Sequence, residues 1–492
     1  MKYFFSSLPN PITKQQVEYW FIPFILYLVV PSVLLSINAF QVGETVTCLC
    51  QFLYTLYLVF SNINQPSYRN NPLMTGAWFY FLYLSIGPLV IIFEIGTSYT
   101  GESFLHNVGI DYRSMLITQL LLNILGIVTW YLGLWVNSRI EIQLATGIEH
   151  ILKYSRYYTY ASVLGVGLQI YLFWSGQVFL GGFDTTQGLT VFTSLGPIFL
   201  SCIPLIGGVL IQKKYYQITW LLILLIQLMW LVFFGKFRLI VAVYLFSVTY
   251  FNQQTLWSKA NLYKILALSI LLFGAGNLYQ LFHFYDLNTA LRHRSDRTAW
   301  QRFSSDFKLN ERYTQKQNVY FTYRIQTSHL PIARMVYLYH QGQLKPLGGE
   351  DLVGNVKNST PANLVYDKKK LLLDEALYEK RFGSIFPFPD IGNTIVLQGL
   401  VDFWIGGVLG YMGIYYGIWG LLFFYVVQQS KIPLLKILFF VLITQQIWSN
   451  IESTMGNALV QARNFLFIVF LCRLSFLLYQ RIIQLSANQA KL

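Results

Sequence analysis

Five basic residues lie within eleven positions of a chain of 492 residues: Arg292, His293, Arg294, Arg297 and Arg302. The guanidinium group of arginine is planar, and its donors match phosphate oxygens in pairs. A solvated basic surface that rests on lipid headgroups has the same composition. The cluster therefore predicts either a phosphate or pyrophosphate site or a headgroup-binding surface.

Two other places combine charge with apolar surroundings. The segment Gly235-Lys236-Phe237-Arg238 joins two apolar stretches. We expect it to be a tight turn, whose cations either snorkel to lipid headgroups or form an anion site. Asp402 begins a third apolar stretch, where a carboxylate is either functional or stabilises a helix N-terminus. These groups are candidates for binding an anion and for moving a proton.

Other chemistry finds little support in the sequence. There is no P-loop, no nucleophile elbow and no zinc-protease motif, and no chain of acids or histidines crosses the apolar segments. The four cysteines fit neither a zinc site nor a disulfide framework, so we expect no metal and no cofactor. They are Cys48, Cys50, Cys202 and Cys472.

The elements that position these residues are apolar. Hydrophobic residues make up 55% of the chain and charged residues 11%, against about 25% charged in soluble proteins. Because apolar runs recur from end to end, we predict an all-α polytopic integral membrane protein with about 12 transmembrane helices. The expected spans are Trp20–Phe40, Val46–Phe60, Leu73–Ile95, Met115–Val136, Tyr157–Trp174, Val191–Ile211, Tyr216–Phe234, Leu239–Leu256, Leu262–Gly276, Ile405–Val427, Leu434–Trp448 and Phe465–Leu478.

One long polar window interrupts this pattern between Gly276 and Asn393, and it holds 16 of the 35 Lys and Arg residues. We therefore expect an N-terminal bundle of about nine helices over residues 1–276, a large loop over 277–393 and a C-terminal bundle of about three helices over 394–492. The aromatic content of the window predicts a folded cap. Its expected helices are Val319–Tyr339, interrupted near Pro331, and Asp367–Arg381.

Lys and Arg in the short loops set the expected orientation. They concentrate in alternate loops, on the side of Lys2 and Lys14, so the positive-inside rule predicts cytoplasmic N- and C-termini. The polar window then faces the periplasm or the extracellular space. This distribution accounts for the net charge of +14 without a nucleic-acid partner. We expect the first span to be an uncleaved helix.

Five glycines form one stripe of the helix that follows the window. Their spacings of four, three, four and three predict a face that a neighbouring helix or a lipid chain approaches closely, with helix packing as the default. They are Gly406, Gly410, Gly413, Gly417 and Gly420.

The layout and two short patches resemble the Wzy-type oligosaccharide repeat-unit (O-antigen) polymerases. Gly235 to Arg238 is similar to a G-x-R turn of that family, stretched by one residue. The run from Gly406 to Gly420 is similar to the G-x-x-G run that follows the large loop. The resemblance covers most of the chain by layout and these two patches by residue.

The resemblance implies a glycosyltransferase of the bacterial plasma (inner) membrane that joins lipid-linked repeat units into O-antigen, capsule or exopolysaccharide. Its donor would be an undecaprenyl-pyrophosphate-linked oligosaccharide, and a chain-length regulator and a flippase are the expected partners. For the base, Asp402 and His293 are the candidates. The expected pyrophosphate contacts are Lys236, Arg238, Arg292, Arg294, Arg297 and Arg324.

Three alternatives stay open. An O-antigen ligase shares the layout and the donor, and the acceptor distinguishes it from a polymerase. A flippase or other transporter would have short loops and polar residues along the middle of the bundle. A structural assembly partner would lack clustered cations facing the membrane.

Overall fold

The computed structural model describes residue 19 and residues 21–92, 109–174, 178–179, 182–183, 198–234, 236–251, 261, 263–264, 329–360, 374–382, 394–449 and 454–489. The described part is built of helices, apart from one short antiparallel ladder in which β1 (Val178–Phe179) pairs with β2 (Gly182–Phe183). An all-α membrane architecture is thus confirmed in its coarse form.

The N-terminal half contains most of the apolar helices. In chain order they are η1 (Ile25–Val29), α3 (Val30–Ser36), α4 (Phe40–Asn62), α5 (Pro66–Arg69), α6 (Pro72–Ile92), α8 (Tyr112–Lys153), α9 (Ser155–Trp174), α11 (Ile203–Leu210), α12 (Gln217–Phe234) and α13 (Lys236–Tyr250).

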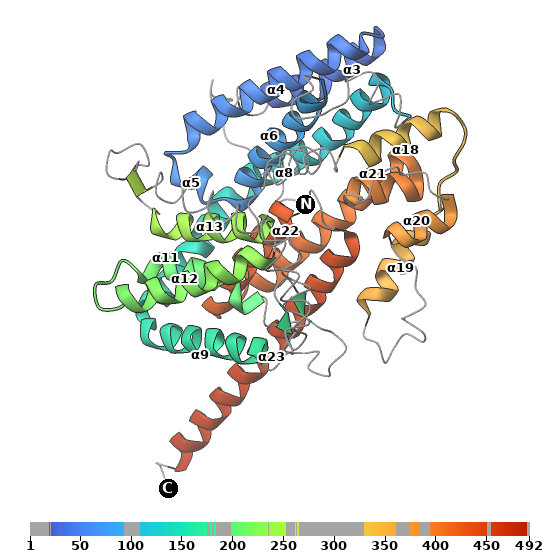
Figure 1. The fold of residues 1–492 in the computed structure, drawn as a ribbon. Coiled ribbons are helices and arrows are strands. Elements are labelled where there is room, and N and C mark those ends of the chain that lie inside the picture. The colour runs from blue at the N-terminus through green and yellow to red at the C-terminus, as the bar shows by residue number, and fades with distance from the viewer. Residues whose placement is uncertain are drawn as a thin grey trace, which may run out of the picture.

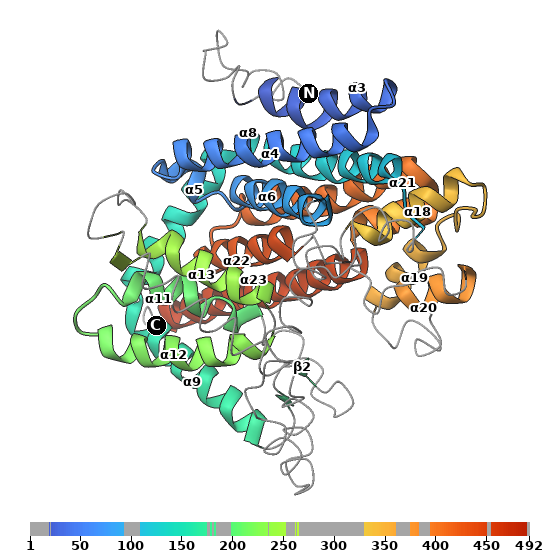
Figure 2. The same cartoon turned by 45° about the horizontal axis from the view of Figure 1, so that its top comes forward.

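Three short helices of the polar window precede the C-terminal helices. They are α18 (Leu330–His340), α19 (Glu350–Ser359) and α20 (Asp374–Phe382). The chain then continues through α21 (Ile395–Leu421), η4 (Leu422–Val427), α22 (Pro433–Ser449) and α23 (Met455–Gln489). In both overall views α18, α19 and α20 lie together beside α21, away from α9, α11 and α12 (Figures 1 and 2).

Among the described residues, four helices are long and apolar enough to cross a membrane. They are Phe40–Asn62, Tyr112–Lys153, Ile395–Val427 and Met455–Leu478. The described part also contains shorter apolar helices, among them Phe21–Ser36, Ile198–Leu210 and Pro433–Trp448. The count of twelve spans stays a prediction.

Helix α8 lies at the centre of the bundle and packs against α4, α6, α18 and α22. Small residues permit this close packing. Gly126 faces the ring of Phe81 in α6, and Gly147 faces Ile437 in α22, so that a methyl group at either position would collide with its neighbour. This use of glycine at contacts between apolar helices is typical of membrane bundles.

Helix α4 is polar on its inner face and apolar on its outer face. Glu44, Thr47 and Gln51 are buried, whereas Val42 and Leu53 are 68% and 57% exposed. A helix in water would have the opposite distribution, because apolar side chains avoid water. An apolar exterior around a polar interior is what a bilayer requires.

The structure differs in part from the predicted boundaries. Lys236 begins α13, so the backbone of Lys236 to Arg238 is the first turn of a helix, whereas a tight turn was expected. Pro331 lies in the first turn of α18, where a proline ring fits. Residues 319–328 of the expected helix lie outside the described part of the chain. The described part of the expected helix at Asp367–Arg381 is α20. No helix was predicted at α19.

Candidate functional site

The candidate site is organised by a break inside α21. Thr394 caps the first half of this helix, since its hydroxyl accepts a hydrogen bond from the Leu397 N–H at 3.0 Å. The helix is interrupted at Phe403 (φ −139°, ψ 22°) and Trp404 (φ 59°, ψ −150°). Asp402 is therefore the last residue of a short first segment.

The break folds the two segments of α21 against each other. Gly399 and Gly407 face one another with their backbones in contact, and a Cβ on either residue would collide with the other. Only glycine allows two backbones to approach so closely. The position of Asp402 is thus fixed by a close contact between two glycines.

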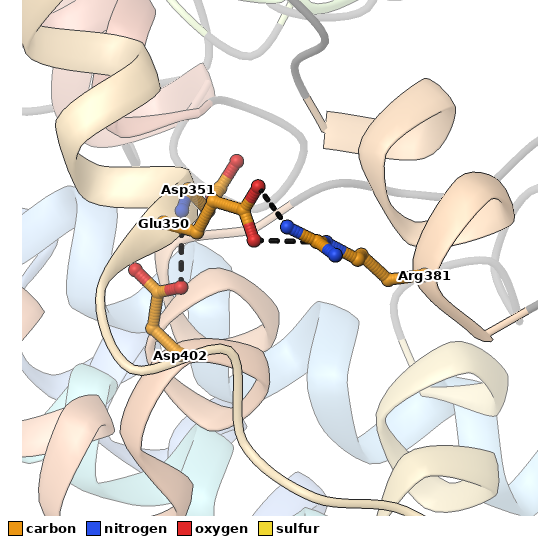
Figure 3. Close-up of polar contacts among 4 residues, drawn as sticks. All are labelled: Glu350, Asp351, Arg381 and Asp402. Atoms are coloured by element: carbon orange, nitrogen blue, oxygen red, sulfur yellow. Dashed lines mark hydrogen bonds and ion pairs between the residues drawn. The ribbon is translucent and has the colours of Figure 1, made fainter.

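The carboxylate of Asp402 caps α19 (Figure 3). Asp402 Oδ1 accepts a hydrogen bond from the Asp351 N–H at 3.1 Å, and Oδ2 accepts one from the Leu352 N–H at 2.9 Å. Asp351 and Leu352 are the second and third residues of α19, whose N–H groups have no partner inside the helix. A negative charge here is further stabilised by the helix dipole.

The loop before α19 returns hydrogen bonds to the end of the first α21 segment. The Leu347 N–H donates to the Val401 carbonyl at 3.0 Å, and the Gly348 N–H donates to the Asp402 carbonyl at 2.9 Å. Tyr339 of α18 donates its hydroxyl to Val401 at 3.2 Å. The carbonyls that the broken helix leaves without partners are therefore satisfied by the window.

A second carboxylate, that of Asp351, lies beside the first. Asp351 Oδ2 accepts hydrogen bonds from the Tyr378 hydroxyl at 3.2 Å and from Gln398 Nε2 at 2.9 Å. Gln398 Oε1 in turn accepts the Met455 N–H at 2.6 Å, at the start of α23. This network joins α19, α20, α21 and α23, and Asp351 and Asp402 are both fully buried.

The exposed rim of the site carries one ion pair. Glu350 accepts two hydrogen bonds from Arg381 of α20, from Nε at 2.9 Å and from Nη2 at 2.7 Å (Figure 3). The neighbouring Glu350 carboxylate raises the pKa of Arg381. Because both side chains are largely exposed, the pair contributes little to stability.

Burial also affects Tyr339, a tyrosine of the window close to Asp402. Burial, and after it the charge of Asp402, raises the pKa of the Tyr339 phenol. The Tyr339 ring meets that of Trp404 edge-on, with centroids 4.3 Å apart. Tyr339 is therefore a neutral hydrogen-bond donor at the break in α21.

One buried histidine, which the sequence analysis did not single out, contacts α8. His329 precedes α18, is 0% exposed, and donates from Nε2 to Gln119 Oε1 of α8 at 3.2 Å. Burial lowers the pKa of His329 to about 4, and a backbone contact with Leu84 opposes this shift. His329 is therefore neutral at physiological pH and fastens α18 to the bundle.

The hydrogen bonds of Asp402 limit what it does chemically. Two backbone N–H groups and the Tyr411 hydroxyl, at 2.5 Å from Oδ2, occupy its oxygens. In this arrangement Asp402 holds α19 in place, and proton abstraction from a substrate would require one of these donors to leave. Its role as a base stays a prediction.

The side chains of the other predicted site residues lie outside the described part of the chain, so their arrangement around Asp402 stays a prediction. The backbones of Lys236 and Arg238 belong to the first turn of α13, and their side chains lie outside the described part of the chain. The remaining candidates also lie outside the described residues: Arg292, His293, Arg294, Arg297 and Arg324. Among the residues described, no group of three or more His, Cys, Asp or Glu side chains could hold a metal ion.

The glycine stripe after the break faces outward. A Cβ at any of its five positions would meet no described atom within 4 Å. The expectation that the stripe packs against a neighbouring helix is wrong for the described part of the chain, and the alternative of a lipid chain stays open. The glycine that packs closely against another part of the backbone is instead Gly407, the residue after Gly406.

No protein-family model, curated protein or solved structure matches this chain. The site is therefore interpreted from its own geometry. It consists of two buried carboxylates, of helix α19 capped by a residue distant in sequence, and of the polar window packed against the first segment of α21.

Proposed function

We propose that this protein polymerises lipid-linked oligosaccharide repeat units into a surface polysaccharide, at the outer face of a bacterial plasma membrane. The observation that carries the proposal is the docking of the polar window onto an apolar helix bundle through Asp402. A site for an amphiphilic substrate needs such a junction, because the lipid must stay in the bilayer while the sugars lie in water.

The reaction follows from the chemistry of a glycosyl pyrophosphate. A hydroxyl of the acceptor unit attacks the anomeric carbon of the donor chain, and the bond from that carbon to the pyrophosphate oxygen breaks. A base takes the hydroxyl proton, and cations stabilise the leaving pyrophosphate. Asp402 or His293 would be the base. The proposed cations are Lys236, Arg238, Arg292, Arg294, Arg297 and Arg324.

The proposed membrane arrangement is that of the sequence analysis. About twelve spans, with both termini in the cytoplasm, leave residues 277–393 outside as a partly helical loop. Helices α18, α19 and α20 belong to this loop and support it as a folded cap. No cofactor takes part, and the membrane partners would be a flippase and a chain-length regulator.

The deciding experiment deletes the gene in its host and analyses lipid-linked and surface glycans by gel and mass spectrometry. We expect the ladder of long chains to disappear while single repeat units still reach the surface, with the ladder restored by the intact gene. Long lipid-linked chains that no longer reach their final acceptor would instead identify a ligase. Repeat units confined to the cytoplasmic face would identify a flippase, and unchanged glycans would reject all three functions.

Within the same assay, each proposed cation is replaced by glutamine, and Lys357→Gln serves as the control. Lys357 is exposed on α19 and belongs to no proposed contact. Shorter chains or lower yield from the cation variants, at equal protein levels, would support the proposed pyrophosphate contacts. An unchanged ladder would reject them.

A further inference from the structure

A large groove lies in the part of the molecule remote from the polar window. Its volume is about 650 Å³, and its walls come from the end of α8, from α9, from residues at the start of α11 and from α22. This volume is within the range of about 300–1,000 Å³ that is typical of ligand sites. The deeper lining is apolar and includes Cys202, Ile203, Ile206, Ile437 and Leu438.

One end of the groove is polar. His150 Nδ1 and the Tyr158 hydroxyl share a hydrogen bond of 2.9 Å, and the ring of Tyr154 lies 4.6 Å from that of His150. All three residues line the groove. Tyrosine is enriched at the membrane–water interface, so this end of the groove fits the level of lipid headgroups.

Basic residues lie close to this polar end, in space or in sequence. Lys153 Nζ lies 5.3 Å from the centroid of the Tyr154 ring, and Lys213 Nζ donates to the Leu152 carbonyl at 3.2 Å. Arg156 is exposed in the first turn of α9, beside Tyr157, which lines the groove. Among the described residues of these helices, Glu149 is the acid nearest in sequence, so positive charge predominates.

The outer surface of α9 indicates the medium from which a ligand would enter. Tyr160, Leu164 and Tyr171 are 65%, 73% and 64% exposed. So many large exposed apolar side chains on one helix fit contact with lipid rather than water. Tyr157 and Phe199, which line the groove, are 73% and 45% exposed, so the groove opens at an apolar outer surface that fits contact with the bilayer.

We propose that this groove binds one anionic phospholipid, with an acyl chain against Cys202 and Ile437 and its phosphate near Lys153 and Arg156. An apolar slot joined to a cluster of cations complements an anionic lipid in both shape and charge, and basic pockets between membrane helices hold such headgroups in other systems. The site is separate from Asp402 and independent of the proposed polymerase activity.

The test uses the purified full-length protein in a neutral detergent. Dioleoylphosphatidylglycerol and dioleoylphosphatidylcholine are added in turn, and bound lipid is counted by native mass spectrometry. We expect the anionic lipid to bind more tightly, and Lys153→Gln and Arg156→Gln each to weaken it about fivefold. Gly165→Leu should fill the groove and remove binding, since a Cβ at Gly165 has its nearest neighbour, Leu200, at 3.7 Å.

Two matched controls separate a built site from general lipid binding. Gly167 lies on the same helix with no described atom within 4 Å of an added Cβ, so Gly167→Leu should leave binding unchanged. Lys357→Gln removes one charge within the polar window and should also have no effect. Should Gly165→Leu fail to fold, Ser162→Leu blocks the same groove.

The proposal is overturned if the two lipids bind equally, or if the groove-filling variants bind the anionic lipid as the unchanged protein does. It is also overturned if neutralising the cations leaves the preference intact. Glycerol phosphate is tested as a competitor. If it displaces the lipid at similar concentration, the site recognises the headgroup alone, and the assignment of the apolar groove fails.

Discussion

The Asp402 carboxylate occupies the capping position that Gly349 leaves empty at the start of α19. Gly349 is the residue before the helix, has φ of +93° and has no side chain to accept from the helix N–H groups. Asp402, from α21, accepts the hydrogen bonds that a local Ser, Asp or Asn would otherwise accept. The helix is thus completed by a residue from the apolar bundle.

Replacing Asp402 should loosen the docked window. Asp402→Ala removes the acceptor for two backbone N–H groups and for Tyr411, and we expect it to cost about 2–4 kcal/mol. Asp402→Asn keeps one acceptor and should cost about 1–2 kcal/mol. Thermal unfolding in detergent measures both changes, and trypsin cleavage after the exposed Lys357 of α19 should accelerate in the same order.

Glu350→Gln is the control for this series, because it breaks only the exposed pair with Arg381. Its effect should stay below about 1 kcal/mol. The variants also test the catalytic hypothesis. A folded Asp402→Asn protein that has lost polymerisation would support a base, and one that polymerises normally would leave Asp402 with its structural role alone.

The fold of α21 should depend on two glycines out of several. Gly399→Ala and Gly407→Ala each push a methyl group into backbone, and we expect losses of about 1–3 kcal/mol or more. Gly413→Ala and Gly417→Ala meet nothing nearby and should be neutral or up to about 1 kcal/mol stabilising, because alanine favours helix. Equal melting temperatures across all four variants would contradict the folded-back geometry.

The sequence predicted the apolar helices and the existence of a folded window because both depend on composition and local periodicity. It did not predict the break at Phe403 and Trp404, since residues 395–421 are apolar apart from Gln398 and Asp402 and contain no proline. The spacing of the glycines predicted a helix face that a neighbouring helix or a lipid chain approaches closely. Spacing alone does not show which glycine contacts another part of the backbone.

The pairing of Asp402 with α19 was equally inaccessible, because the residues that bond to it lie 51 and 50 positions away. Asp402 was expected to be functional or to stabilise the N-terminus of its own helix. It instead caps a different helix, α19. Helix α19 itself has few apolar residues and no local cap, which explains why no helix was predicted there. His329 could have been noticed as a histidine directly before the apolar start of α18.

Acidification should destabilise the protein through His329. Burial holds the pKa of this group at about 4, below its ordinary value of 6.5. Above pH 6.5 the His329 ring is neutral in both the folded and the unfolded state, so it does not lower the free energy of unfolding. As the pH falls toward 4, His329 binds a proton in the unfolded state but not in the folded state. The free energy of unfolding then falls by about 3 kcal/mol in total.

Melting temperatures between pH 7.5 and pH 4 measure this effect, and His329→Gln should flatten the curve over that interval. The exposed His340 at the end of α18 provides the control: His340→Gln should leave the slope as it is. A slope that His329→Gln leaves unchanged would exclude this histidine as its source.

Glu44 provides a fourth prediction. Its carboxylate is fully buried in α4, and neither oxygen has a hydrogen-bond partner among the described residues. Because burying an unpaired charge is costly, Glu44→Gln should raise stability by about 1 kcal/mol or more. Glu141→Gln, on the exposed surface of α8, should change nothing. A clear loss of stability in Glu44→Gln would show that a cation from elsewhere in the chain pairs with Glu44.

The broken helix also makes α19 and α21 mechanically dependent on each other. The same residue ends the first segment of α21 with its carbonyl and begins α19 with its carboxylate. Straightening α21 would remove the Asp402 cap from α19. Pulling α19 away would leave the carbonyls at the break in α21 without their hydrogen-bond donors. A sideways displacement of the window would therefore change the angle between the two segments of α21, with the hinge at Asp402.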